Sequence, residues 1–432
     1  MIQHEMSRIL YIAYHFPPLG GAGVQRSLKF VKYLPEFGVE PLVLTGTGSD
    51  NNNRWTPADE SLLDDLDQPG CVNRTPWTLS PARGSFVSNQ LAAARELVRR
   101  YHFSLIIVSA SPFEDLSVAA TLASELEIPW IADLRDPWAL DEFQVYRSAW
   151  HRHRERQRMR VALRSASLVI MNTSEAARRL VAAFPEFAKD RVISITNGFD
   201  SEDFCTNDAP KPANGKFSIV HAGFMHTAAG LRQRRNAWQY RLLSRIERGV
   251  EILPRSHFYL LKALEKWMKS QPHVVDRVRL TFVGAVTEVD KQLVNQSPAR
   301  SMVEFTGYVD HAASLAHIRG ADLLFLPMHK MPSGRRATIV PGKTYEYMAT
   351  GIPILAPVPA GDARDFLEAA GTGLICEPDD VDEMVRHLCA AFRAWEEGLP
   401  LCTWKKQAAE RFERRVLTER LATEITRIAG SG

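Results

Sequence analysis

The sequence lacks the features of a disulfide-bonded, metal-binding or membrane-spanning protein. Its five cysteines are scattered without CxxC spacing, so we expect reduced thiols rather than a disulfide framework or a zinc site. No apolar run approaches the length of a membrane span, and the N-terminus MIQHEMSRIL has no signal-peptide core. The net charge of +3 gives no strong preference for nucleic acid. These absences favour a cytoplasmic globular protein.

The length and the order of predicted elements indicate two α/β domains. A chain of 432 residues is too long for one ordinary domain. Short apolar runs alternate with helical patterns in both halves, which is typical of parallel sheets covered by helices. A stretch rich in Pro, Asn and Gly separates the halves. We predict an N-terminal domain, a linker, a C-terminal domain and a final segment packing back toward the N-terminal domain, at residues 1–200, 201–215, 216–410 and 411–432, with a continuous closing helix at 404–428.

The stretch 341–359, PGKTYEYMATGIPILAPVP, predicts a loop, a short helix and a buried strand. The helix would begin near Thr344 with its free N–H groups facing outward, and Gly351 would end it. Such a helix start attracts phosphate, and Lys343 would add a positive charge. Glu346, one turn in, could accept two ribose hydroxyls. A capped helix with a surface Glu and Lys explains the stretch about as well.

Two strand ends in the first half carry further candidates. The strand predicted at 8–14 runs into FPPLGGAGVQR, where Gly20, Gly21 and a third glycine form a loop before a helix. Backbone amides can approach a phosphate or sugar there, although the spacing is not GxGxxG and a tight turn is a fair alternative. The strand at 129–133 ends in ADLRDPW, which places Asp133, Arg135 and Asp136 where ligands collect in open sheets. An Arg–Asp pair holding a loop is the alternative.

Three segments stand out from the alternation of strands and helices. Residues 46–87 are polar and predict a long surface excursion. Residues 147–166 predict a basic helix, which we interpret first as a solvated face. Residues 231–248, LRQRRNAWQYRLLSRIER, predict one inserted amphipathic helix, for which membrane surface, acceptor contact and surface packing all remain open.

With these motifs in view, the chain resembles the GT-B glycosyltransferases of the retaining family 4 type, the glycosyl transferases group 1. Four pieces in the family's order carry the resemblance: FPPLGGAGVQR, ITNGFDSEDF, VEFTGYVD with ADLLFLP, and PGKTYEYMATGIPILAP. The resemblance implies two Rossmann-like domains facing each other across a cleft, with the C-terminal helix crossing back. It also implies a UDP-, GDP- or dTDP-linked sugar donor, a hydroxyl acceptor and no separate cofactor.

The resemblance also assigns candidate site residues. The donor would be held mainly by the C-terminal domain, with Glu346 at the ribose, the residues after one strand at the base and Gly223 by the diphosphate. Because Phe224 stands where many relatives have an arginine, the cations at the diphosphate would come from Lys343, Arg255 or an arginine in 231–248. The donor-binding candidates are Gly20, Gly223, Arg255, Gly307, Tyr308, Lys343, Thr344 and Glu346. The catalytic candidates are Gly21, Arg135 and Asp136. No metal site is predicted, because no pair of carboxylates ends a C-terminal strand.

Three positions depart from the family pattern. Thr338 stands where many relatives have a glutamate eight positions before the ribose-binding one, and Phe224 stands where many have an arginine after Gly223. Arg135 stands near the place of a histidine at the reacting sugar. The departures affect the predicted sugar identity more than the reaction class.

The predicted function is therefore a retaining, metal-independent transfer of a sugar to a hydroxyl of a glycan, a lipid-linked or a small-molecule acceptor. The first glycine loop offers no general base, and an inverting enzyme would have to use His15 or Asp136. The alternatives are a sugar-nucleotide epimerase or phosphorylase of the same fold, or a weakly active sugar-nucleotide-binding partner protein. Peripheral contact with an anionic membrane through the basic segments is a further hypothesis.

Overall fold

The computed structural model describes residues 7–20, 22–47, 59–66, 69–75, 83–204 and 215–430. They divide into two compact units, each with one parallel sheet. Unit 1 comprises Met1–Asp141, His153–Gly198 and Phe412–Gly432, and unit 2 comprises Glu142–Arg152 and Phe199–Arg411. The chain therefore passes between the units after residues 141, 152, 198 and 411, so that neither unit is one continuous stretch of sequence.

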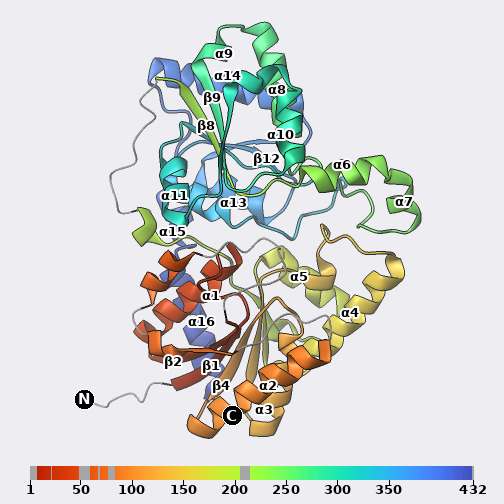
Figure 1. The fold of residues 1–432 in the computed structure, drawn as a ribbon, viewed down its shortest axis with the longest axis vertical. Helices are drawn as coiled ribbons and strands as arrows, with labels where there is room; N and C mark the ends of the chain where they lie inside the picture. The colour runs from red at the N-terminus through yellow and green to blue at the C-terminus, as the bar shows by residue number, and fades with distance from the viewer. Residues whose placement is uncertain are drawn as a thin grey trace. The chain divides into compact units, whose positions relative to one another are not determined.

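The sheet of unit 1 has seven strands in the order β3-β2-β1-β4-β5-β6-β7, all parallel (Figure 1). The chain builds outward from β1 to β3 and then restarts on the other side of β1 with β4, so the order reverses between β1 and β4. Ligands bind at such reversal points in open α/β sheets. The strands are Ser7–Ala13 (β1), Val39–Thr45 (β2), Val72–Arg74 (β3), Leu105–Ala110 (β4), Trp130–Leu134 (β5), Leu168–Met171 (β6) and Val192–Ser194 (β7).

Helices cover both faces of this sheet, which explains why its strands are apolar on both sides. One core joins the sheet to α2 (Arg83–Arg100), α3 (Asp115–Leu126), α4 (Ala149–Leu163) and α5 (Ser174–Ala183). The other core joins it to α1 (Ala22–Tyr33) and α16 (Arg414–Ala429), which lie beside each other (Figure 1). The last helix of the chain is therefore part of the core of unit 1.

The sheet of unit 2 has six strands in the order β10-β9-β8-β11-β12-β13, again parallel. Its order reverses between β8 and β11. Its core includes an aromatic group in which Phe217, Trp267 and Phe392 pack edge to face. The strands are Phe217–Ala222 (β8), Val278–Val283 (β9), Val303–Gly307 (β10), Leu323–Phe325 (β11), Ile354–Pro357 (β12) and Gly373–Cys376 (β13).

Ten α-helices between residues 215 and 411 belong to unit 2. The longest, α14, packs against α8 on one side of the sheet. They are Thr227–Arg235 (α6), Ala237–Leu242 (α7), Phe258–Ser270 (α8), Val274–Arg277 (α9), Glu288–Asn295 (α10), His311–Arg319 (α11), Lys343–Thr350 (α12), Asp362–Ala370 (α13), Val381–Glu397 (α14) and Lys406–Glu410 (α15). No helix in the described ranges is long and apolar enough to cross a membrane.

Several elements differ from the sequence-based expectation. Residues 231–248 contain the end of α6 and the short α7, not one helix, because the helical ladder breaks at Asn236. The closing helix is interrupted too: Glu413 caps α16, so α15 and α16 are separate. The predicted surface excursion 46–87 contains β3. Residues 142–152, predicted in the N-terminal domain, group with unit 2. Most of the predicted linker, residues 205–214, lies outside the described residues.

Candidate active site

The candidate donor site lies at the order reversal in unit 2, just beyond the carboxyl end of β8. Gly223 follows β8 with a φ of 113°, a conformation that favours glycine. A Cβ atom added there would lie 2.7 Å from Nζ of Lys343, at the start of α12. The missing side chain therefore leaves room for the lysine ammonium beside the strand end.

Lys343 is held by a buried histidine of β8. His221 Nδ1 lies 2.8 Å from the carbonyl of Phe325 on β11, and its Nε2 lies 3.0 Å from Lys343 Nζ. A carbonyl can only accept, so Nδ1 carries the proton and Nε2 accepts from the ammonium. Burial and the lysine charge keep the pKa of His221 well below its ordinary value, so the ring stays neutral.

Neighbouring groups shift the pKa of Lys343 in opposite directions. Burial, followed by the positive charge of Arg255, lowers the pKa of this lysine to about 7, while the carboxylate of Glu346 acts in the opposite direction. The Arg255 guanidinium lies 4.9 Å from the centre of the Phe143 ring, a cation–π arrangement. Two cations thus lie near each other at the strand ends, where an anionic group would relieve their repulsion.

The start of α12 differs in part from the prediction. The amides of Thr344 and Tyr345 donate to the carbonyls of Pro341 and Gly342, at 3.0 and 3.2 Å, so these two N–H groups are already used. The hydroxyl of Thr344 is buried and has no hydrogen-bond partner among the described residues. Glu346 lies in the first turn and is partly exposed. The prediction of a helix start with free amides is therefore wrong for these two groups.

Gly307 and Tyr308 lie at the same edge of the sheet but two strands away. Gly307 ends β10 with a φ of 74°, and Tyr308, 49% exposed, follows it. The strand order β10-β9-β8 separates this pair from Gly223. The structure therefore brings Gly223, Arg255, Lys343, Thr344 and Glu346 together, with Gly307 and Tyr308 farther along the edge.

Sequence reasoning missed a buried carboxylate beside Thr338. Glu142 is fully buried, accepts from the Thr338 backbone N–H at 2.8 Å and from its hydroxyl, and lies 3.3 Å from Nε2 of His329. Burial alone would raise the pKa of Glu142, but the adjacent His329 and the hydrogen bonds from Thr338 and the backbone lower it to about 2. The carboxylate that the sequence lacks at position 338 is thus present nearby, supplied by a residue 196 positions upstream.

Unit 1 contains a second buried polar centre that involves Asp133 and Arg26. The Arg26 side chain is 1% exposed and contacts both carboxylate oxygens of Asp133, with Nη2–Oδ1 at 2.6 Å and Nε–Oδ2 at 2.9 Å. It also donates to the carbonyls of Ile195 and Thr196. The ion pair considered for ADLRDPW therefore uses Arg26, not Arg135, and Asp133 is committed to a structural contact.

Arg135 supports the first glycine loop. Its guanidinium donates to the Gly23 carbonyl and, at 3.4 Å, to the carbonyls of Ala110 and Ser111. Burial and the Arg135 charge lower the pKa of His15 to about 3. Asp136 is exposed at the same strand end and Gly20 is buried in the loop, whereas the predicted catalytic Gly21 lies outside the described residues.

The part of the chain that the structure describes has no group of three or more His, Cys, Asp or Glu residues that could hold a metal ion.

Comparisons with known proteins agree with this architecture. Residues 20–198 match the family model described as a glycosyl transferase 4-like domain, and residues 253–393 match the model described as glycosyl transferases group 1. Together the two matches cover most of the chain, one in each half. No curated protein sequence matches.

Solved structures share the fold at low sequence identity. HepE of Anabaena in complex with UDP-glucose is 18% identical with a TM-score of 0.64, and covers 97% of this chain and 99% of its own. Sucrose-phosphate synthase of Thermosynechococcus elongatus is 15% identical with a TM-score of 0.68, and covers 99% of this chain and 100% of its own.

A third neighbour shows how widely the fold is shared. A putative UDP-N-acetylglucosamine 2-epimerase of Listeria monocytogenes is 11% identical with a TM-score of 0.59, and covers 98% of this chain and 97% of its own. A fold shared with both a sucrose-phosphate synthase and an epimerase does not by itself choose the reaction. The two family matches make that choice, and with the paired Rossmann-like sheets they identify the chain as a glycosyltransferase of the GT-B fold.

Proposed function

We propose that the enzyme transfers a sugar from a nucleoside-diphosphate sugar to a hydroxyl acceptor with retention of the anomeric configuration. The observation that carries the proposal is the pair of cations, Lys343 and Arg255, beside the side-chain-free Gly223 at the end of β8. A diphosphate is the kind of dianionic group that would offset the mutual repulsion of these cations.

The other donor contacts follow from their positions along the edge of the sheet. Glu346 would accept the ribose hydroxyls, and Gly307 with Tyr308 would lie at the base. Thr344 would turn its buried hydroxyl to the phosphate, because that oxygen has no other partner among the described residues. Gly20 and Gly21 would close over the sugar. A UDP-sugar is the first choice, since HepE was solved with UDP-glucose, and GDP- and dTDP-sugars are the alternatives.

In this proposal the reaction needs no metal ion. The bond between the anomeric carbon and the diphosphate oxygen breaks, the acceptor oxygen bonds to that carbon, and the hydroxyl proton passes to the departing phosphate oxygen. Lys343, Arg255 and backbone dipoles would stabilise the charge on the leaving group. Arg135 would act by holding the glycine loop, and Asp136 would lie at the acceptor side.

Two features support retention over inversion. An inverting enzyme needs a base on the face opposite the leaving group, and such a base needs a pKa suited to its task. His15 is a weak base, with its pKa lowered to about 3, and Asp133 is tied to Arg26. Asp136 remains the alternative base if the product proves to be inverted.

The acceptor and the place of action belong to the same proposal. A glycan, a lipid-linked or a small-molecule hydroxyl would all suit the chemistry. We place the enzyme in the cytoplasm, where reduced thiols persist, because its five cysteines are dispersed without CxxC spacing. Peripheral contact with the inner face of an anionic membrane would bring it to a lipid-linked acceptor.

The test uses the purified full-length chain with UDP-, GDP- and dTDP-sugars and an acceptor panel. Release of nucleoside diphosphate that depends on an acceptor is expected, and proton NMR of the first-formed glycoside should show the donor's anomeric configuration. Turnover should survive EDTA. An inverted product would contradict the mechanism, and loss of turnover with EDTA that magnesium or manganese restores would contradict the charge assignment.

A further inference from the structure

We propose that unit 2 docks on an anionic bilayer through a basic–aromatic surface formed by the start of α4 and by α7. This surface comprises Trp150, Trp238, Leu242 and Leu243 with Arg147, Arg241 and Arg248. The inference rests on the proposed function only for its purpose, which is to bring a lipid-linked acceptor to the enzyme. The surface itself can be tested without donor or acceptor.

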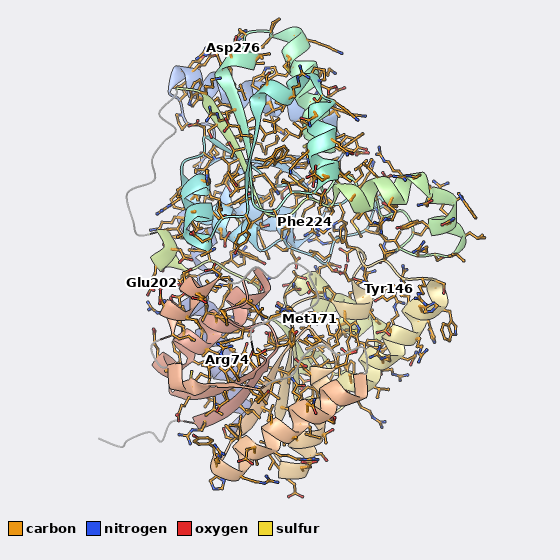
Figure 2. All side chains as sticks on the ribbon, in the orientation of Figure 1. Arg74, Tyr146, Met171, Glu202, Phe224 and Asp276 are labelled. Atoms are coloured by element: carbon orange, nitrogen blue, oxygen red, sulfur yellow. The ribbon has the colours of Figure 1, made fainter. Side chains whose placement is uncertain are left out.

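Backbone hydrogen bonds join the two segments of this surface. The N–H of Tyr146, labelled in Figure 2, donates to the carbonyl of Arg245 at 2.6 Å, and the N–H of Ala149 donates to Leu243 at 2.9 Å. Both segments belong to unit 2. The basic-aromatic stretches that the sequence shows about 90 positions apart are therefore one surface, with the first turn of α4 against the end of α7.

The apolar side chains of this surface are exposed to solvent. Trp238 is 66% exposed and Leu242 is 74% exposed, and their i,i+4 spacing puts them on one face of α7. Tyr240, between them, is 7% exposed and lies under the Arg245 guanidinium. Where the start of α4 meets the end of α7, Trp150 is 61% exposed and Leu243 is 44% exposed. Large apolar side chains left in water at one place indicate an interaction site.

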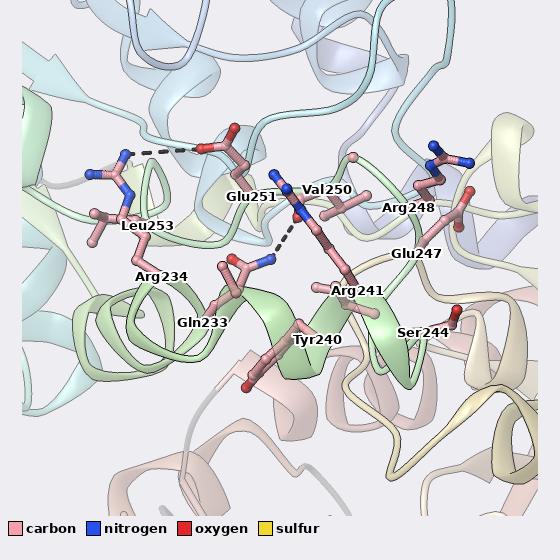
Figure 3. Close-up of a pocket in the computed structure, with 13 residues that line it drawn as sticks. Gln233, Arg234, Tyr240, Arg241, Ser244, Glu247, Arg248, Val250, Glu251 and Leu253 are labelled. Atoms are coloured by element: carbon pink, nitrogen blue, oxygen red, sulfur yellow. Dashed lines mark hydrogen bonds and ion pairs between the residues drawn. The ribbon is translucent and has the colours of Figure 1, made fainter.

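The charges of this surface favour an anionic partner. Residues 231–248 contain six arginines and one acidic residue, Glu247, which is already paired with Arg335. Arg241 and Arg248 are exposed and form no ion pair within the described part of the chain. Both lie around a cavity of about 710 Å³ between α6–α7 and the segment 247–253, where Arg234 faces Glu251 at 3.9 Å (Figure 3).

An anionic bilayer fits this combination better than a soluble anion or a second copy of the chain. Tryptophan and leucine can enter the boundary between headgroups and acyl chains while neighbouring arginines contact lipid phosphates. A soluble anion would use the arginines but not the two exposed tryptophans. A second copy of the chain would carry the same excess of positive charge, and two such faces repel each other.

The direct experiment is co-sedimentation of the full-length chain with vesicles of phosphatidylglycerol and phosphatidylcholine, compared with vesicles of phosphatidylcholine alone. We expect binding to the anionic vesicles at low salt and weaker binding at high salt, because ionic strength screens the attraction. The absence of binding to anionic vesicles would overturn the proposal, and so would equal binding to both kinds of vesicle. Neither result depends on transferase activity, which a soluble acceptor tests separately.

Paired variants locate the contact. Arg241→Glu with Arg248→Glu should lower partitioning at least about tenfold, because each arginine near an anionic surface contributes about fivefold. Trp238→Ala with Leu242→Ser should lower partitioning even at low salt. Lys269→Glu and Leu399→Ala, at exposed positions elsewhere in unit 2, are the matched controls.

Three outcomes of the variant series contradict the proposal. Controls that lose as much binding as the paired variants would remove the surface from the contact. Paired variants that bind like the unchanged chain, with the same thermal midpoint, would do the same. Sedimentation velocity showing that Trp238→Ala dissolves a dimer while vesicle binding persists would assign the face to a second copy.

Discussion

At the scale of single residues, the proposed role of Lys343 predicts that donor binding depends on pH. Its pKa of about 7 lies well below the ordinary lysine value, so the ammonium loses its charge as the pH rises through neutrality. We expect the affinity for UDP to fall between about pH 7 and about pH 9, by at most about tenfold per pH unit. A bound diphosphate favours the charged form, so binding near neutrality should take up a proton.

Calorimetry in buffers of different ionisation enthalpy measures both effects. Lys343→Arg keeps a permanent charge and should flatten the pH dependence, whereas Lys343→Met should bind weakly at every pH. A wild-type affinity that stays constant over this range would show that Lys343 does not meet the diphosphate.

Glu346 should contribute to donor affinity through hydrogen bonds to the ribose. Replacing it with alanine is expected to weaken UDP-sugar binding by roughly 1–3 kcal/mol, the usual cost of losing a charged hydrogen-bond partner. Glu346→Gln keeps the size and one acceptor and should lose less. Titration calorimetry gives the two affinities directly, and an unchanged affinity for the alanine variant would remove Glu346 from the site.

Glu142 should make the stability of the protein depend on pH in the acidic range. Its pKa of about 2 lies below that of an unfolded glutamate, so its stabilising effect is present above about pH 4.5 and is lost as the pH falls toward 2. Glu142→Gln removes one partner of the buried contact with His329 and is expected to cost roughly 3–5 kcal/mol.

Urea unfolding at several pH values checks this prediction. The glutamine variant should have a lower free energy of unfolding at neutral pH. Its free energy of unfolding should also fall less than that of the wild type when the pH is lowered. Glu304→Gln, a half-exposed glutamate on the edge strand β10, is the control and should behave like the unchanged chain. Parallel stability curves for the wild type and Glu142→Gln would refute the assigned role.

Single-residue partners were the least predictable part of the site. Lys343 and Gly223 could be selected because each stands next to a strand end or a helix start, which local sequence reveals. The partners Arg26–Asp133 and Glu142–Thr338 lie 107 and 196 residues apart, and no local pattern connects them. The burial of Arg26 is decided by packing across the sheet, which its place in a helix does not reveal.

At the scale of elements, strands with continuous apolar runs were predictable. Such strands are covered on both faces and need apolar residues at successive positions, which can be read from the sequence. β3, with three residues and only partial burial, carries too little pattern to be found. The helix breaks inside 231–248 and 404–428 were missed because the helical spacing of apolar residues continues across them. In the structure a local turn or cap interrupts the helical hydrogen bonds at each break.

The point where the chain leaves and re-enters unit 1 should be sensitive to one added methyl group. A Cβ atom on Gly198 would lie 2.1 Å from the carbonyl oxygen of Phe412 and 2.7 Å from a methyl carbon of Leu417. We expect Gly198→Ala to lower the free energy of unfolding by about 1–3 kcal/mol, as overpacking does. Gly70→Ala, which meets nothing within 4 Å, is the matched control for urea unfolding. Equal stability of the two variants would contradict the close approach.

At the scale of the whole molecule, two sheets of the predicted class are present, and the resemblance to GT-B enzymes pointed to the correct architecture. The division of the chain was harder to foresee. Composition predicts a linker at residues 201–215, but nothing in the residues 142–152 shows that they group with unit 2. Their assignment depends on buried contacts such as Glu142 with His329, which exist only in the folded chain.

The discontinuous course of the chain also limits how its parts can be recombined with those of relatives. An exchange made with a single junction at residue 198 would transfer His329 and Thr338 of unit 2 without the Glu142 that contacts them. Such a hybrid would contain the buried His329 and Thr338 of this chain together with the other parent's segment in place of residues 142–152. Unit 2 can therefore be grafted intact only if residues 142–152 are transferred with it.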